Sequence, residues 1–105
     1  MVEHTDDGHH VVVGGRRWRA TDPRIPDDEA AVLRRWLMAA RRDVGAARRA
    51  GDGAAVSAAR SRVHAAKTAL GERGTPWWEQ TDDERRTRVT VGLRRAGQEG
   101  FGPAP

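Results

Sequence analysis

The chain has 105 residues, no cysteine and a formal net charge of +4, a size that fits one domain. The lack of cysteine excludes disulfides and every thiolate-based metal or redox centre. No apolar run reaches the roughly 18 to 20 residues that a membrane-spanning helix needs, and the acidic N-terminus is unlike a signal peptide. We therefore expect a cytoplasmic protein that has no membrane partner.

The N-terminal part of the chain predicts a β-hairpin after a short tail. Residues 1–8 are polar and lack periodicity, so they are expected to form a disordered tail. Three valines, a Gly-Gly pair and an alternating run then predict a hairpin over residues 9–20, in which Val11 would face Trp18. A lone hairpin is marginal in water, so one of its faces is expected to pack inward. That face would carry Val11, Val13, Trp18 and Ala20.

Three helices are predicted after the hairpin, over residues 26–50, 54–72 and 82–96. The first two carry apolar stripes at helical spacing and are joined by a Gly-Asp-Gly reversal, so they should lie antiparallel. Thr81 with a glutamate three residues later predicts a capping box for the third helix. The Gly- and Pro-rich residues 97–105 are expected to be a flexible tail. The fold class is α+β and mainly α: a β-hairpin packed on an antiparallel helix pair, plus a short third helix.

Positive charge is concentrated in the middle of the chain. Residues 34–73 carry a net charge of +7, whereas residues 1–33 carry −3 and residues 74–105 carry zero. Arginine pairs recur every seven residues along the first helix. A solvated helix face, or a genome rich in Arg and Ala codons, would explain part of this pattern. The other interpretation is a surface that follows a phosphate backbone. Its candidate residues are Arg17, Arg19, Arg34, Arg35, Arg41, Arg42, Arg48, Arg49, Arg60 and Lys67.

The adjacent Trp77 and Trp78 follow the second helix in a loop. Aromatic side chains dominate small cores, so one of the two could close the end of the helix pair while the other packs on the third helix or on Trp18. The alternative is an exposed aromatic anchor for a protein partner or for a nucleic-acid base. The alanine-rich side of the second helix could contribute to the same contact or to a homodimer. Its residues are Ala55, Ala58, Ala59, Ala66 and Ala69.

Residues with catalytic or metal-binding chemistry do not form a recognisable site in the sequence. His9 and His10 are neighbours on a strand and should point to opposite faces, which is poor geometry for one ion. Ser57, Ser61 and His64 lie on an alanine-rich helix without the turn and oxyanion donors that a nucleophile needs. No catalytic residue, metal ion or cofactor is therefore predicted.

Several stretches between residues 10 and 80 resemble a known family. They are GRRWRATDP (residues 15–23) with IP (25–26), LMAARR (37–42), RVHAAK (62–67) running into ALGERG (69–74), and WW (77–78). The chain thereby resembles an uncharacterised family of short proteins from actinobacteria and related bacteria, some of which are automatically labelled biopolymer transporter Tol-like. The resemblance implies a shared compact domain and brings no activity or functional residues. The transporter label disagrees with the lack of an apolar segment long enough to span a membrane.

These observations predict a non-enzymatic cytoplasmic binding module. The first hypothesis is contact with nucleic acid through the basic helix pair. The alternative is a protein-protein or self-associating adaptor that uses the alanine-rich face together with Trp77 and Trp78.

Overall fold

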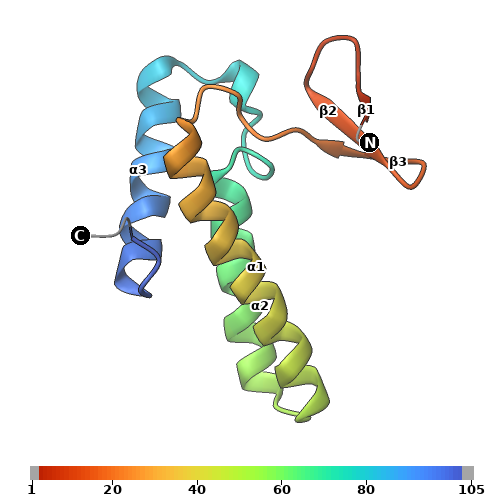
Figure 1. Cartoon of the computed structure of the whole chain (residues 1–105), viewed down its shortest axis with the longest axis vertical. Coiled ribbons are helices and arrows are strands. Elements are labelled where there is room, and N and C mark those ends of the chain that lie inside the picture. The colour runs from red at the N-terminus through yellow and green to blue at the C-terminus, as the bar shows by residue number, and fades with distance from the viewer. Residues whose placement is uncertain (1–2, 103–105) are drawn as a thin grey trace.

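A computed structural model describes residues 3–102, which form a small sheet, a long helical hairpin and a third helix (Figure 1). This arrangement confirms the α+β, mainly α fold class. The elements in chain order are β1 (Glu3–His4), β2 (His10–Val13), β3 (Arg16–Arg19), α1 (Asp27–Arg49), α2 (Gly53–Ala69), the 3-10 turn η1 (Trp77–Glu79) and α3 (Asp82–Gln98).

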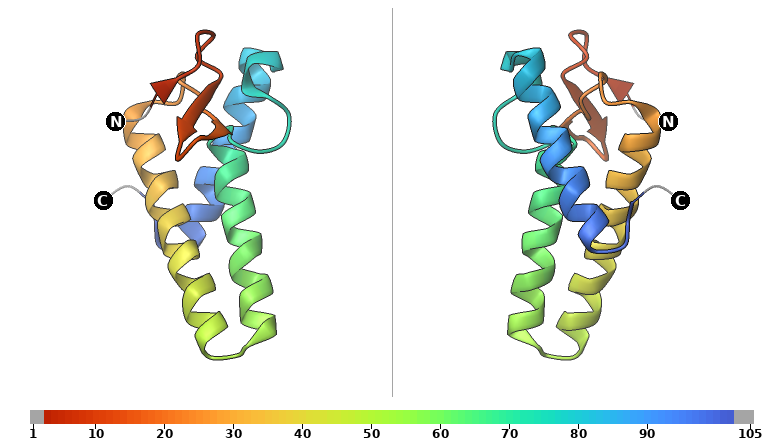
Figure 2. Two further views of the ribbon diagram at one scale, coloured as in Figure 1. Left: turned by 90° about the vertical axis from the view of Figure 1, so that its right-hand side faces the viewer. Right: turned by 90° about the vertical axis from the view of Figure 1, so that its left-hand side faces the viewer.

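Helices α1 and α2 run antiparallel along the length of the molecule, as both views in Figure 2 show. Pro26 precedes α1, and three acidic residues occupy its first turn, where they meet the positive end of the helix dipole. Gly51 reverses the chain with a φ of 69°, which a residue with a side chain rarely adopts. The side chain of Asp52 then accepts a hydrogen bond from the Ala55 N–H at 3.0 Å and caps α2.

The core lies at one end of the helical hairpin, where α3 packs against α1 and α2. Leu33, Trp36 and Leu70 are almost fully buried there. Helices α2 and α3 approach closely because residue 92 is glycine: a Cβ atom at that position would lie 2.3 Å from the Ala69 Cβ. Alanine and glycine thus set the spacing of the helices, and the few large residues supply most of the buried apolar area.

Helix α3 begins at the predicted capping box. The Thr81 hydroxyl accepts from the Glu84 N–H at 3.2 Å, and the Glu84 carboxylate accepts from the Thr81 N–H at 2.8 Å. The expectation of a flexible tail over residues 97–105 needs correction, since α3 continues to Gln98 and Phe101 packs against the core. The Phe101 N–H also donates to the Ala96 carbonyl at 2.9 Å. Residues 103–105 lie outside the described part of the chain.

The sheet has three antiparallel strands in the order β1-β2-β3. Val11 lies opposite Trp18, which confirms the register predicted for the hairpin. The expected disordered tail over residues 1–8 is wrong for residues 3–8, because Glu3–His4 pairs with β2 and the Thr5 hydroxyl accepts from the His10 N–H at 3.1 Å. Residues 1–2 lie outside the described range.

The sheet projects to one side of the helices (Figure 1), so the face that was predicted to pack inward is only partly buried. Ala20 is buried, whereas Val13 is 51% exposed and Trp18 is 42% exposed. The sheet is held at its edge by the segment after α2: the Trp77 Nε1–H donates to the Ala20 carbonyl at 2.9 Å, and Arg19 donates to the Gly74 carbonyl at 2.7 Å. Contacts at one edge leave the far end of the hairpin in solvent.

Candidate functional site

A groove between α1 and α2 gathers arginine side chains around two valines. Its volume is about 410 Å³. We call it the cationic groove, and its lining consists of Arg41, Val44, Arg48, Arg60, Val63 and Arg73.

Helical periodicity explains why these side chains meet. Arg41 and Arg48 are seven residues apart on α1, so they lie two turns apart on nearly the same stripe. Arg60 and Lys67 have the same spacing on α2. The two helices are antiparallel neighbours, so their stripes border one groove, and Arg73 joins them from the loop after α2. The two valines are half-buried between the helices.

None of the groove arginines has a carboxylate partner within 4 Å among residues 3–102. Instead, the Arg41 Nη1 lies 3.8 Å from the Met38 sulfur, and the Arg73 Nη1 lies 3.5 Å from the His64 Nδ1. The lining contains no aspartate or glutamate. Positive charge in the groove is therefore not neutralised by a direct ion pair within the described part of the chain.

The pKa of Lys67 responds to its burial and to the charges of two arginines that line the cationic groove, Arg73 and Arg41. Burial lowers the pKa of its ammonium group, and the positive charges of Arg73 and Arg41 lower the same pKa further. The one carboxylate that acts in the opposite direction is Glu72, whose Oε2 accepts a hydrogen bond from the Thr21 hydroxyl at 2.8 Å. A lowered lysine pKa means that the charged form is disfavoured, here mainly by burial and to a smaller extent by the neighbouring cations.

Trp18 continues this surface toward the sheet. The Lys67 ammonium lies 5.6 Å from the centre of the Trp18 ring, and the Arg16 guanidinium lies 4.7 Å from it. Both distances are within the range of cation–π attraction. Trp18, predicted as a core residue, is instead an exposed ring with two cations close to it.

Other arginines predicted from the sequence lie outside the cationic groove. Arg34 extends the stripe of Arg41 and Arg48 but lies in a hollow that Asp22 and Asp27 also line. Arg35 shares a different hollow with two acidic residues of the first turn of α1. The guanidinium of Arg49 folds back toward Gly45.

Three more predicted cations have no place in the groove lining. Arg42 and Arg17 are exposed. Arg19 is engaged by the Gly74 carbonyl and lies 5.8 Å from the Trp78 ring. The structure thus brings together Arg41, Arg48, Arg60 and Lys67 from the predicted set and adds Arg73, which the sequence analysis missed.

The tryptophan pair is mostly internal. Trp77 is 7% exposed and cannot anchor a partner without leaving the core. Trp78 is half-buried, with its ring stacked on His9 at 3.9 Å and an interplanar angle of 5°. The pair therefore connects the sheet to the helices, which favours the structural interpretation of these residues.

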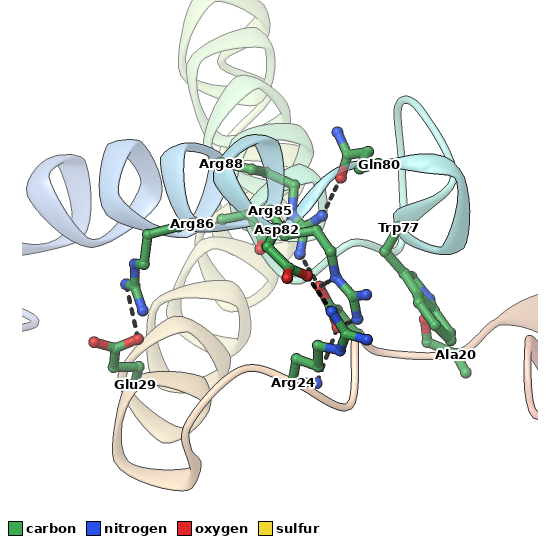
Figure 3. Close-up of polar contacts among 11 residues, drawn as sticks. Ala20, Arg24, Glu29, Trp77, Gln80, Asp82, Arg85, Arg86 and Arg88 are labelled. Carbon is green, nitrogen blue, oxygen red and sulfur yellow. Dashed lines mark hydrogen bonds and ion pairs between the residues drawn. The ribbon is translucent and has the colours of Figure 1, made fainter.

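A buried carboxylate fixes the loop before α1 to α3, and sequence reasoning missed it. Asp22 is 2% exposed and accepts hydrogen bonds from Arg85, Arg88 and the Arg24 N–H. Figure 3 shows Arg85 and Arg88 reaching from α3 toward this loop. Arg88 also donates to the Ala69 carbonyl at 3.2 Å and to Gln80.

The electrostatics of this cluster favour the ionised carboxylate. Burial raises the pKa of the Asp22 carboxyl, but the hydrogen bonds from Arg85, the Arg24 N–H and Arg88 outweigh it and lower the pKa to about 2. Asp22 in turn raises the pKa of the Arg85 guanidinium. One sequence signal was available, because Arg85 falls on the same helical stripe as the apolar Val89 and Ala96. An arginine in that position needs a buried partner.

Metal-ligand clusters and membrane-spanning helices are both absent from residues 3–102. No three histidine, cysteine, aspartate or glutamate side chains come together there as ligands for an ion. No helix of that part of the chain is both long enough and apolar enough to cross a bilayer. Comparison with protein-family models, with curated proteins and with solved structures found no match to the chain. Function is therefore inferred from the residues and their geometry.

Proposed function

We propose that the protein is a non-enzymatic, cytoplasmic nucleic-acid-binding module that contacts the phosphate backbone through the cationic groove. The observation that carries this proposal is the convergence of Arg41, Arg48, Arg60 and Arg73 on one groove whose lining has no carboxylate. Such a surface binds polyanions by releasing their counterions, and it does not depend on base sequence.

The dimensions suit a phosphate backbone. Within the groove, Arg41 and Arg48 lie on one stripe of α1 about 10 Å apart along the helix axis, at 1.5 Å per residue. Duplex DNA carries one charge for about every 1.7 Å of its axis, so several phosphates would lie within reach of this stripe. Guanidinium groups are suited to phosphate because their planar fork can donate two parallel hydrogen bonds.

The local crowding of cations argues against an ordinary solvated face. A solvated helix face is stabilised by pairs of opposite charge spaced by three or four residues. Between residues 30 and 51, α1 has six arginines and only one acidic residue, Asp43. That aspartate pairs with Arg62 at 3.1 Å, which is not part of the groove lining. A bound polyanion would relieve the repulsion that the fold otherwise has to tolerate.

The protein-protein alternative loses most of its proposed surface. Ala59, Ala66 and Ala69 are each at most 2% exposed because they pack within the chain. Trp77 is buried as well. A partner that used these buried residues would have to separate the helices, and only Ala55 and Ala58 of the proposed alanine face remain half-buried or exposed.

Fluorescence anisotropy with labelled 16-nucleotide single strands and 16-base-pair duplexes tests the proposal. We expect binding at about 50 mM salt that weakens steeply by about 200 mM, with little dependence on sequence. The triple variant Arg41→Gln, Arg48→Gln and Arg60→Gln should weaken binding at least tenfold. It should also reduce the slope of log K against log salt by about 2 to 3, because each lost phosphate contact removes roughly 0.7 to 0.9 from the slope.

A matched control separates the groove from net charge. The triple variant Arg35→Gln, Arg42→Gln and Arg49→Gln removes the same number of positive charges, all of them from a stripe of α1 that does not line the groove. It should retain most of the affinity. No binding at 50 mM salt, or an equal loss in both triple variants, would show that the groove is not a nucleic-acid site.

A further inference from the structure

A second groove lies between α2 and α3, and its lining is mainly apolar. Its volume is about 300 Å³, which is near the lower end of the range for small-molecule sites. The lining includes Trp36 of α1, which is 1% exposed. The full lining comprises Trp36, His64, Ala65, Thr68, Ala69, Arg88, Val91, Gly92 and Arg95. We call this the α2–α3 groove.

Two polar atoms of the lining residues are buried without a partner. The indole Nε1–H of Trp36 and the hydroxyl of Thr68 have no hydrogen-bond partner among residues 3–102. They are the two buried side-chain polar atoms left in that state in this part of the chain. Buried donors are nearly always satisfied in proteins, so an unsatisfied pair in one groove requires an explanation. Both groups can act as donors, and because each atom has almost no exposed area, an acceptor in the groove reaches them when the side chains that cover them move aside.

The positive charge of the α2–α3 groove favours an anionic acceptor. Arg88 and Arg95 belong to its lining, which contains no aspartate or glutamate. The guanidinium of Arg88 is engaged by Asp22, Gln80 and the Ala69 carbonyl.

Arg95 is held less firmly. It lies 5.8 Å from the Trp36 ring, and its Nε is 3.8 Å from the carboxylate of Glu99. Glu99 also pairs with Arg62 at 3.5 Å. Arg95 can therefore turn to an anionic ligand at the cost of one long ion pair.

We propose that the α2–α3 groove binds a small carboxylic acid with an apolar, ring-sized body. The carboxylate accepts hydrogen bonds from the Trp36 indole and the Thr68 hydroxyl and faces the charge of Arg95. The body of the ligand packs on Ala65 and on Val91, which is 57% exposed. This site is separate from the cationic groove, so the two proposals can fail independently.

The test uses 3-phenylpropionate as the probe and 3-phenylpropan-1-ol as its neutral counterpart. Proton–nitrogen correlation spectra of the full chain resolve the indole N–H signals of its four tryptophans. Titration to about 10 mM covers the affinity range of fragment-sized ligands. We expect a saturable downfield shift of the assigned Trp36 indole signal with the acid, and binding at least fivefold weaker with the alcohol.

Three variants define the contacts. Thr68→Val keeps the shape of the side chain and should weaken binding of the acid about tenfold, the usual effect of losing a hydrogen bond to a charged group. Arg95→Gln should weaken binding several-fold. Glu99→Gln should strengthen it, because the ligand then no longer competes for Arg95. The backbone signals of each variant report whether it remains folded.

The inference is overturned by any of three results in folded protein. These are a Trp36 indole signal that does not shift in a saturable way, equal affinity for the acid and the alcohol, or unchanged affinity in Thr68→Val. The triple variant of Arg41, Arg48 and Arg60 should bind the probe as well as the unmodified protein does, which separates this result from that of the nucleic-acid test.

Discussion

Replacing Asp22 with asparagine removes the charge that joins the loop before α1 to α3. The Asp22 side chain is 1% exposed and faces the guanidinium groups of Arg85 and Arg88, which are 10% and 7% exposed. Asparagine has nearly the same size but cannot neutralise them. Removing one partner of a buried ion pair leaves an uncompensated charge, and this typically costs about 3 to 5 kcal/mol. We expect a decrease of that size in the free energy of unfolding at pH 7.

The pH dependence provides a second measure of the same interaction. The pKa of the Asp22 carboxyl is lowered to about 2 from 3.8. A carboxyl whose folded-state pKa is depressed stabilises the fold above its unfolded pKa, and this contribution is lost as the pH falls through the folded value. The difference in stability between the unmodified protein and Asp22→Asn should therefore shrink below about pH 4. The linkage relation gives a reduction of about 1 kcal/mol by pH 3 and about 2 kcal/mol below pH 2.

Urea denaturation followed by far-ultraviolet circular dichroism measures both effects, because a small domain usually unfolds in one step. The control is Asp43→Asn, which breaks an ion pair with Arg62 in which the aspartate side chain is 58% exposed. Exposed pairs contribute about 0 to 1 kcal/mol. The reasoning about Asp22 is refuted if the two variants lose the same stability, or if the difference for Asp22→Asn stays constant from pH 7 to pH 3.

Two further changes test how the helices are assembled. Gly92→Ala places a Cβ atom 2.3 Å from the Ala69 Cβ. It should therefore lower the free energy of unfolding by about 1 to 3 kcal/mol. A variant as stable as the unmodified protein would mean that α2 and α3 are farther apart. Thr81→Ala removes one half of the capping box and should lower the free energy of unfolding by about 0.5 to 2 kcal/mol. The same urea denaturation measures this loss. The control Thr87→Ala, at an exposed position inside α3, should lower the free energy of unfolding by less.

Local signals in the sequence were sufficient to predict the helices. The prolines, capping residues and glycines around α1, α2 and α3 act within a few residues of the helix ends. The helix bounds therefore agree with the predicted ranges to within three residues. The hairpin register was predictable for the same reason, since a two-residue loop fixes which residues face each other.

Contacts between distant segments were not predictable in this way. Asp22 and Arg85 are 63 residues apart, and nothing near Asp22 marks it as buried. The orientation of the sheet depends on Trp77, Arg19 and their backbone partners, so an alternating pattern alone placed Trp18 on the wrong side. The seven-residue arginine repeat predicted two stripes on α1 but could not show which one borders α2. Arg73 was missed because it lies in a loop and belongs to neither stripe.

The charge layout follows partly from helix capping, and that part can be separated from the rest. Acidic residues fill the first turns of α1 and α3 and the N-cap of α2, where the helix dipole stabilises them. Helix capping therefore accounts for seven of the 15 acidic residues. It does not explain why the middle lacks the mixed charges that exposed helices usually carry, since α2 from residue 54 onward has three cations and no acid. Helix stability alone would favour replacing some of those cations with glutamate. The uniform sign of the groove is therefore a feature that stability does not require, and the polyanionic ligand that we propose would account for it.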